Sequence, residues 1–101
     1  MRVEYERTGG FAGMRIAASF DLAELQPAEA EETRQLIESA GFKDLPEDIS
    51  DGAAIPDQFT HKITITGDTW KHTVVTTDNS MPDSLQPLVE KLNLLARQHR
   101  G

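Results

Sequence analysis

The sequence predicts an α+β fold class: a four-stranded antiparallel sheet with two helices on one face, in the order β-β-α-β-β-α. Two observations lead to this prediction. Two pairs of segments alternate apolar and polar residues with the period of a half-buried strand, and two other segments repeat apolar residues every three or four positions, as amphipathic helices do. Both helices lying on one face of two joined hairpins is the economical way to bury the apolar sides.

Composition limits the kind of protein. The 101 residues suit one small domain, spanning residues 1–101, with a single core and no disulfide framework because cysteine is absent. A net charge of −7 disfavours binding to phosphate backbones. The start lacks a signal-peptide pattern, and no apolar run approaches the roughly 18 residues that cross a bilayer. We therefore expect a cytoplasmic, monomeric protein that binds neither nucleic acid nor a membrane.

The first hairpin is expected over residues 2–20. Val3 and Tyr5 alternate with glutamates, which indicates a strand with one buried face. After a glycine-rich segment the chain alternates again, and a second strand returns with its apolar face formed by Met14, Ile16, Ala18 and Phe20.

The segment between these strands, residues 7–13, reads Arg-Thr-Gly-Gly-Phe-Ala-Gly. Its three glycines allow the positive φ angles that tight connections require. Turn geometry does not explain Phe11, because a large apolar ring at a turn is unfavourable in water. The ring either folds back onto the core or is held out for a partner, and the residues alone leave both alternatives open.

The first helix is expected from Pro27 to Ala40. Proline suits a first helical turn, and the glutamates that follow it complement the helix dipole. Gly41 followed by the apolar Phe42 matches a left-handed C-cap. Residues 43–58 contain two prolines and no apolar period, so we expect a long loop. Three apolar residues could pin this loop to the core: Leu45, Ile49 and Ile55.

A second hairpin follows the loop, with its turn at residues 67–69 (Gly-Asp-Thr). Threonine is frequent in both strands, and its branched Cβ suits a pleated surface. One face of the third strand is expected to carry Phe59, His61, Ile63 and Ile65, and one face of the fourth Trp70, His72, Val74 and Thr76.

The last helix is expected to begin near Ser84, with that serine as its cap and Pro87 in its first turn. Its apolar stripe comprises Leu85, Leu88, Val89, Leu92, Leu95 and Ala96. The core between the layers is expected to contain Tyr5, Phe20, Ile37, Ile63, Val74 and Leu88.

Catalytic and metal-binding patterns are weak. His61 and His72 are expected across from one another on neighbouring strands, but no third ligand has suitable spacing, so hydrogen-bonding histidines are favoured over a metal site. The chain lacks a cysteine nucleophile, a serine elbow and a phosphate-binding loop. We expect no metal, no cofactor and no enzymatic activity, hence a binding or regulatory domain.

The opening residues 1–13 (Met-Arg-Val-Glu-Tyr-Glu-Arg-Thr-Gly-Gly-Phe-Ala-Gly) resemble the start of the emfourin family, small bacterial inhibitors of thermolysin-like zinc metallopeptidases such as protealysin. Further similar segments follow in the same order and cover nearly the whole length. They are residues 25–31 (Leu-Gln-Pro-Ala-Glu-Ala-Glu), 42–46 (Phe-Lys-Asp-Leu-Pro), 72–75 (His-Thr-Val-Val) and 81–88 (Met-Pro-Asp-Ser-Leu-Gln-Pro-Leu).

The resemblance implies an inhibitor that occupies the active-site cleft of a thermolysin-like peptidase, often one encoded beside it, with the zinc held by the peptidase. Such enzymes favour a bulky apolar side chain just after the bond to be cut, which makes Phe11 the anchor candidate. A preformed hairpin also lowers the ordering cost of binding. The candidate contact residues are Thr8, Gly9, Gly10, Phe11, Ala12, Gly13 and, at the end of the second strand, Asp21.

The alternative function is a non-inhibitory interaction or adaptor module that uses the open face or an edge strand of the sheet. A gene for a thermolysin-like peptidase beside this one would favour the inhibitor.

Overall fold

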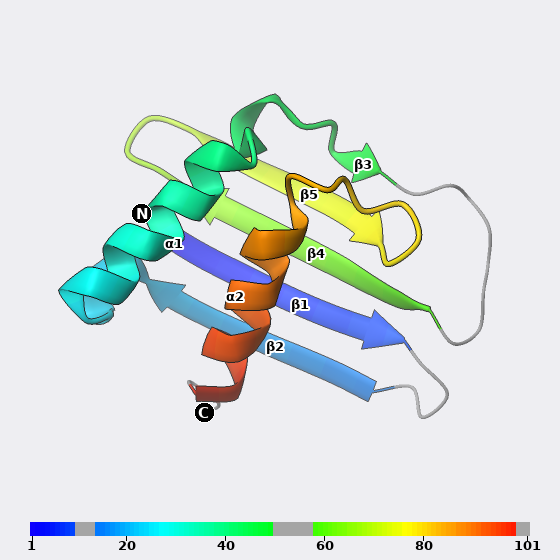
Figure 1. Cartoon of the computed structure of the whole chain (residues 1–101), viewed down its shortest axis with the longest axis horizontal. Helices are drawn as coiled ribbons and strands as arrows, with labels where there is room; N and C mark the ends of the chain where they lie inside the picture. Colours follow the sequence, from blue (N-terminus) through cyan, green and yellow to red (C-terminus); the bar gives the residue numbers. More distant parts are fainter. Residues whose placement is uncertain (10–13, 50–57, 99–101) are drawn as a thin grey trace.

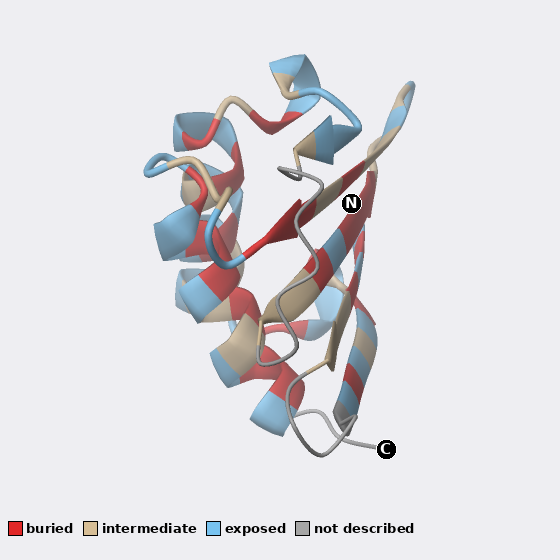
Figure 2. Ribbon diagram, turned by 90° about the vertical axis from the view of Figure 1, so that its right-hand side faces the viewer, coloured by how far each residue is buried: buried red, intermediate tan, exposed pale blue. Residues whose placement is uncertain are grey.

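A computed structural model, which describes residues 1–9, 14–49 and 58–98, shows an α+β fold with a sheet on one side and helices on the other (Figures 1 and 2). The strands are β1 (Arg2–Gly9), β2 (Met14–Asp21), β3 (Asp48–Ile49), β4 (Phe59–Thr66) and β5 (Lys71–Thr77), and the helices are α1 (Pro27–Ser39) and α2 (Gln86–Gln98). Two short 3-10 helices, η1 (Leu22–Glu24) and η2 (Phe42–Asp44), flank α1. No helix of the described part is long and apolar enough to cross a membrane.

The sheet has five strands in the order β2-β1-β4-β5-β3, one more than expected. The four predicted strands pair antiparallel, as expected. The fifth, β3, lies in the segment predicted to be a loop and pairs parallel with β5, so the prediction of a purely antiparallel four-stranded sheet was wrong. Val75 N donates to Glu47 O at 2.7 Å and Thr76 Oγ1 to Ile49 O at 2.9 Å. Two residues are too few to produce an alternating pattern, which explains why the sequence did not reveal this strand.

The core lies between the sheet and the two helices, as Figure 2 shows from the side. Each of the six residues predicted for it is at most 3% exposed, as is Phe42 after α1. The predicted stripe of α2 is buried along its whole length. Leu45 and Ile49 pack against the core and pin their segment as expected, whereas Ile55 lies outside the described residues.

The ends of α1 follow the sequence signals. Pro27 is the first helical residue, where its missing N–H removes no intrahelical hydrogen bond. Gly41 adopts the left-handed conformation (φ 63°, ψ 38°) just past the helix, and Phe42 packs back into the core.

The start of α2 differs from the prediction. The helix begins at Gln86, and Val89 N donates to Leu85 O at 3.0 Å in its first turn. Ser84 is not the cap, because its hydroxyl donates to Ala40 O at 3.4 Å. That carbonyl belongs to Ala40, the C-cap of α1, where backbone acceptors lack helical partners, so the serine connects the segment before α2 to the end of α1 instead. Pro87 does lie in the first turn, as predicted.

Candidate partner-binding site at the hairpin end

The candidate contact residues lie at one end of the sheet, where β1 ends at Gly9 and β2 begins at Met14. Thr8 and Gly9 are the last residues of β1, and they pair with Arg15 and Met14 of β2. Gly10, Phe11, Ala12 and Gly13 lie outside the described residues, so the orientation of the Phe11 ring stays a prediction. The described part shows the two strand ends that these four residues connect in the sequence.

Position 9 requires glycine, both for its backbone conformation and for the space around it. Its φ is +113°, a conformation that L side chains rarely adopt, and a Cβ at this position would lie 2.6 Å from Gln58 O. Gly9 pairs with Phe59, the first residue of β4. The glycine therefore lets the end of the hairpin lie close against the backbone that enters β4.

Aromatic and cationic side chains brace the same end of the sheet. The Arg7 guanidinium carbon lies 4.6 Å from the centre of the Phe59 ring, a cation–π distance that joins β1 to β4. Beside it, Asn79 N donates to the Gln58 side chain at 3.0 Å, which ties the entry of β4 to the turn after β5. Three strands are thus held together immediately behind residues 10–13.

A line of hydrogen-bonded polar groups runs inward from this end, from the exposed Asp78 to the buried His61 and Tyr5. Both carboxylate oxygens of Asp78 are used: Oδ2 accepts from Phe59 N at 3.1 Å, and Oδ1 lies 2.6 Å from His61 Nε2. The other ring nitrogen, Nδ1, lies 2.8 Å from the Tyr5 hydroxyl, which donates to Asn93 Oδ1 of α2 at 3.1 Å. We call Asp78, His61, Tyr5 and Asn93 the polar relay.

The two central residues of the polar relay are enclosed by the core, whereas the Asp78 side chain at its outer end is 44% exposed. Tyr5 is 1% exposed and His61 is 3% exposed. Burial raises the pKa of Tyr5 to about 12, because removing a phenolate from water is unfavourable; the Asp78 charge also raises it, while Arg7 and the hydrogen bond to Asn93 oppose the shift. The tyrosine therefore stays a neutral donor, and the relay connects α2 rigidly to the hairpin end.

Asp21 lies at the other end of the strand pair. It pairs with Arg2, whereas Gly9 pairs with Met14, and an eight-residue strand separates the two ends by about 23 Å. Its carboxylate accepts from Ala23 N at 2.9 Å, and its own N–H donates to Glu24 Oε1 at 3.1 Å, which is a capping box for η1. Asp21 and residues 8–13 therefore do not form one compact patch, although Asp21 remains a predicted contact.

The two strand histidines do not face each other, which corrects the prediction. His61 pairs with Thr76, and His72 pairs with Ile65 at the other end of the same ladder. Both are hydrogen-bonded, as the sequence favoured: His61 within the polar relay, and His72 through Nε2, which lies 2.6 Å from Leu45 O. Within the described part no group of three or more His, Cys, Asp or Glu side chains could hold a metal ion.

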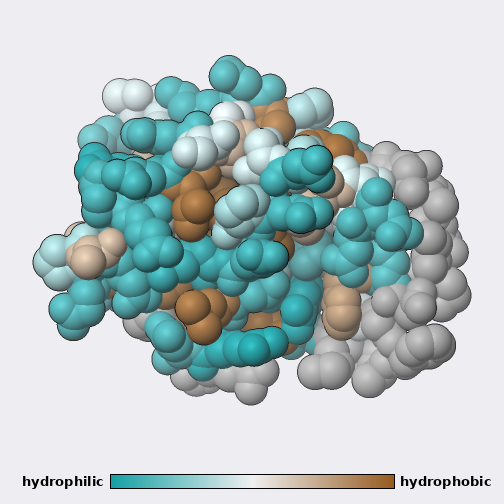
Figure 3. Space-filling model, viewed as in Figure 1, coloured by the Kyte–Doolittle hydropathy of each residue, from teal (hydrophilic) through white to brown (hydrophobic). Residues whose placement is uncertain are grey.

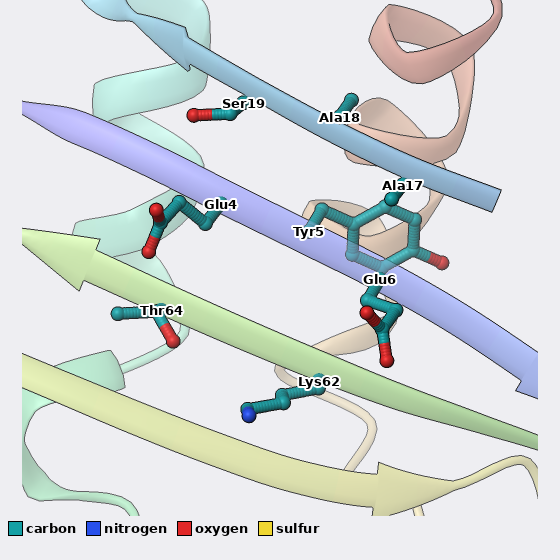
Figure 4. Close-up of a pocket in the computed structure, with 8 residues that line it drawn as sticks. All are labelled: Glu4, Tyr5, Glu6, Ala17, Ala18, Ser19, Lys62 and Thr64. Carbon is teal, nitrogen blue, oxygen red and sulfur yellow. The ribbon is translucent and has the colours of Figure 1, made fainter.

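The open face of the sheet, opposite the helices, carries a shallow hollow (Figure 4). It forms because Ala17 and Ser19 are small and lie beside longer side chains on β1 and β4. Glu4, Glu6 and Lys62 stand around it. The helical face is mainly hydrophilic with scattered apolar groups (Figure 3), and Leu94, 47% exposed, is the exposed large apolar side chain among the described residues.

Sequence reasoning missed the polar relay. The sequence predicted a hydrogen-bonded His61 and a core position for Tyr5, but it indicated neither Asp78 nor Asn93 as their partners. Asn93 lies between two buried leucines of α2, Leu92 and Leu95, and such a polar residue beside an apolar stripe is the signal that could have indicated a buried hydrogen bond. Its partners come from distant strands, so no local pattern specifies them.

The fold and this site define a class of protein: a small α+β domain in which the strands of the first hairpin end at a braced end of the sheet. The family model Emfourin matches residues 5–93, which is most of the chain, so the protein belongs to the Emfourin family. Searches of curated proteins and of solved structures returned no match. Membership implies, in general terms, an inhibitor that binds a metallopeptidase rather than an enzyme.

Proposed function

We propose that this protein inhibits thermolysin-like zinc metallopeptidases of the protealysin type by placing residues 8–13 in the active-site cleft. The observation that carries the proposal is the family match over residues 5–93, which includes the whole first hairpin. The inhibitor acts as a cytoplasmic monomer, contributes no metal and leaves the zinc to the peptidase.

The hairpin end suits this role physically. An inhibitor gains affinity when its contact segment is ordered before binding, because less conformational entropy is lost in the complex. The Arg7–Phe59 contact, the Gly9 backbone and the polar relay hold the end of β1 against β4, and Met14 at the start of β2 pairs with Gly9. Phe11, in the middle of that segment, is the predicted anchor for an apolar subsite.

The proposal is tested by titrating a thermolysin-like peptidase with the purified protein and with Phe11→Ala. If Phe11 is the anchor, the variant weakens inhibition by more than about 2 kcal/mol, roughly 30-fold, and its melting midpoint stays nearly unchanged. Leu94→Ala is the matched control, since it also truncates a large apolar side chain, and Leu94 is 47% exposed on α2, outside the candidate contact residues.

Three other results would change the proposal. Loss of stability in Phe11→Ala, with inhibition falling only as folded protein is lost, would place the ring in the core. Full inhibition by a stable Phe11→Ala would move the contact to Asp21, residues 47–58 or the Gly67-Asp68 turn. No inhibition by the wild type would favour the adaptor function, for which the hollow on the open sheet face is the candidate surface.

A further inference from the structure

The outer edge of β2 is a second candidate binding surface, because it presents backbone hydrogen-bonding groups. β2 is the end strand of the sheet, and it pairs with β1 through eight consecutive residue pairs without a bulge. Sheet edges are usually blunted by prolines, bulges or very short strands, because an unpaired edge can template another strand. β2 has none of these three features.

The register identifies which backbone groups face outward. Leu22 N donates to Met1 O at 2.9 Å, and this pair continues the β1–β2 register, so the even-numbered residues of β2 direct their N–H and C=O groups towards β1. The odd-numbered residues therefore direct theirs away from it. Asp21 agrees, because its N–H is taken by Glu24 Oε1 rather than by β1.

Three residues remain along the edge: Arg15, Ala17 and Ser19. Their backbone N–H and C=O groups have no partner within the described part of the chain. Ala17 and Ala18 are small, so side chains leave the centre of the edge accessible. An added antiparallel strand would bond to both groups of each of these residues.

The strand added at this edge belongs either to a second copy of the chain or to a different protein. The position of α2 decides between these two partners. α2 contacts β2, and its last turn extends past the outer edge of that strand (Figure 1). Two copies paired antiparallel along β2 would be related by a two-fold axis perpendicular to the sheet, which brings both α2 helices over the same edge on the same face. The two α2 helices would therefore clash with each other. An extended segment without a helix above it fits beneath the single α2, since stacked layers pack about 10 Å apart.

We propose that the outer edge of β2 accepts an extended segment of the partner peptidase as an added sixth strand. This inference rests on the proposed function and names a second contact of the same complex. β2 begins at Met14, directly after residues 10–13, so a peptidase that holds the hairpin end meets Arg15 immediately. The Arg15 guanidinium is already paired with Glu6 of β1 at 2.7 Å, so at this residue only the backbone groups are open to the segment. Opposite Ala17 the segment carries a small or polar residue, beside the hollow of Figure 4.

Amide hydrogen exchange of the wild-type protein tests the inference residue by residue. In the free protein the amides of Arg15, Ala17 and Ser19 exchange quickly, while those of Ile16, Ala18 and Phe20 are protected by β1. In the complex with an inhibited thermolysin-like peptidase, the first group slows at least about tenfold. Fast exchange of these amides in an inhibited complex overturns the added strand and leaves the proposed function intact. If the protein does not inhibit the peptidase at all, the proposed function is refuted, and with it the peptidase segment proposed to pair with this edge.

A substitution at Ala17 separates the backbone from the side chain. Ala17→Pro removes one outward N–H, which an edge strand tolerates, and weakens inhibition about fivefold or more. Ala17→Val keeps the N–H and favours extended structure, so its inhibition stays within about twofold of the wild type. Equal inhibition by a folded Ala17→Pro overturns the inference. If that variant fails to fold, the exchange pattern of the wild type decides alone.

Discussion

The single tyrosine of this chain gives a direct test of the polar relay. Tyr5 is the one tyrosine among 101 residues, so the absorbance of its phenolate reports this group alone. Burial raises its pKa to about 12, about two units above the ordinary value of about 10. Each unit corresponds to 1.36 kcal/mol, so the shift is linked to roughly 2.7 kcal/mol of folding free energy.

The sign of the pH dependence follows from the direction of the shift. Below about pH 10 the hydroxyl is protonated in both the folded and the unfolded chain, and its contribution to stability is fully present. Between about pH 10 and pH 12 the unfolded chain releases the proton first. The free energy of unfolding therefore falls by about 1.36 kcal/mol per pH unit in this range.

Two measurements check this prediction. Phenolate absorbance should titrate near pH 12 in the folded protein and near pH 10 in denaturant. Denaturant melts at about pH 9, 10 and 11 should show the loss of stability, with Tyr5→Phe as the control, because other basic groups titrate in both proteins but the phenolate only in one. A folded-state midpoint near 10 would refute the enclosed relay.

Three further predictions concern stability. Leu88→Ala and Ile63→Ala, at positions that are 0% exposed, should each cost about 2 to 5 kcal/mol in denaturant melts, and losses below about 1 kcal/mol at both would contradict the core. Gly9→Ala should cost about 2 to 4 kcal/mol, since the new side chain combines a positive φ with a close contact to Gln58 O. Gly41→Ala, with no atom within 4 Å of its added Cβ, should cost only about 1 to 2 kcal/mol. Equal losses of stability would mean that the protein relaxes to relieve the contact with Gln58. Asp21→Ala should be about 1 kcal/mol less stable than the wild type in denaturant melts, because the cap of η1 is lost, and a folded variant with unchanged inhibition would remove Asp21 from the predicted contacts.

The sequence predicted the elements whose signals repeat. Four strands, two helices and six core residues follow from periodicity, because burying one face of each element requires apolar residues at regular spacing. Single residues with a strong backbone preference also predicted the helix ends correctly: Pro27 begins α1, and Gly41 follows its end. The Emfourin family was likewise indicated by short segments whose order and spacing fit, although none is specific alone.

The errors share a physical cause: each depended on a partner distant in sequence. Ser84 looks like a helix cap, but the free carbonyl of Ala40 at the end of α1 takes its hydroxyl. The sequence also failed to predict that His61 and His72 lie in different pairs of the β4–β5 ladder. The pairing register depends on the whole length of both strands and on the turn between them, which a local pattern does not specify. The parallel β3 pairs through only two residues, and its bonds to β5 are visible only once the loop is packed.

The arrangement of this small domain connects its core to its hairpin end. A sheet covered on one face leaves the strand ends with few packing contacts, so these ends would ordinarily be the first part to open. Here Tyr5 and His61 bring hydrogen bonds from the core out to Asp78, and Asp78 fixes Phe59, the residue that pairs with Gly9. Because a buried donor or acceptor without its partner costs about 1 to 3 kcal/mol, opening this end would also break the relay. The same groups that stabilise the fold thus also fix the end of β1, the strand that leads into the proposed contact residues 10–13. In the proposed function this matters because a contact segment that is ordered before binding loses less entropy in the complex.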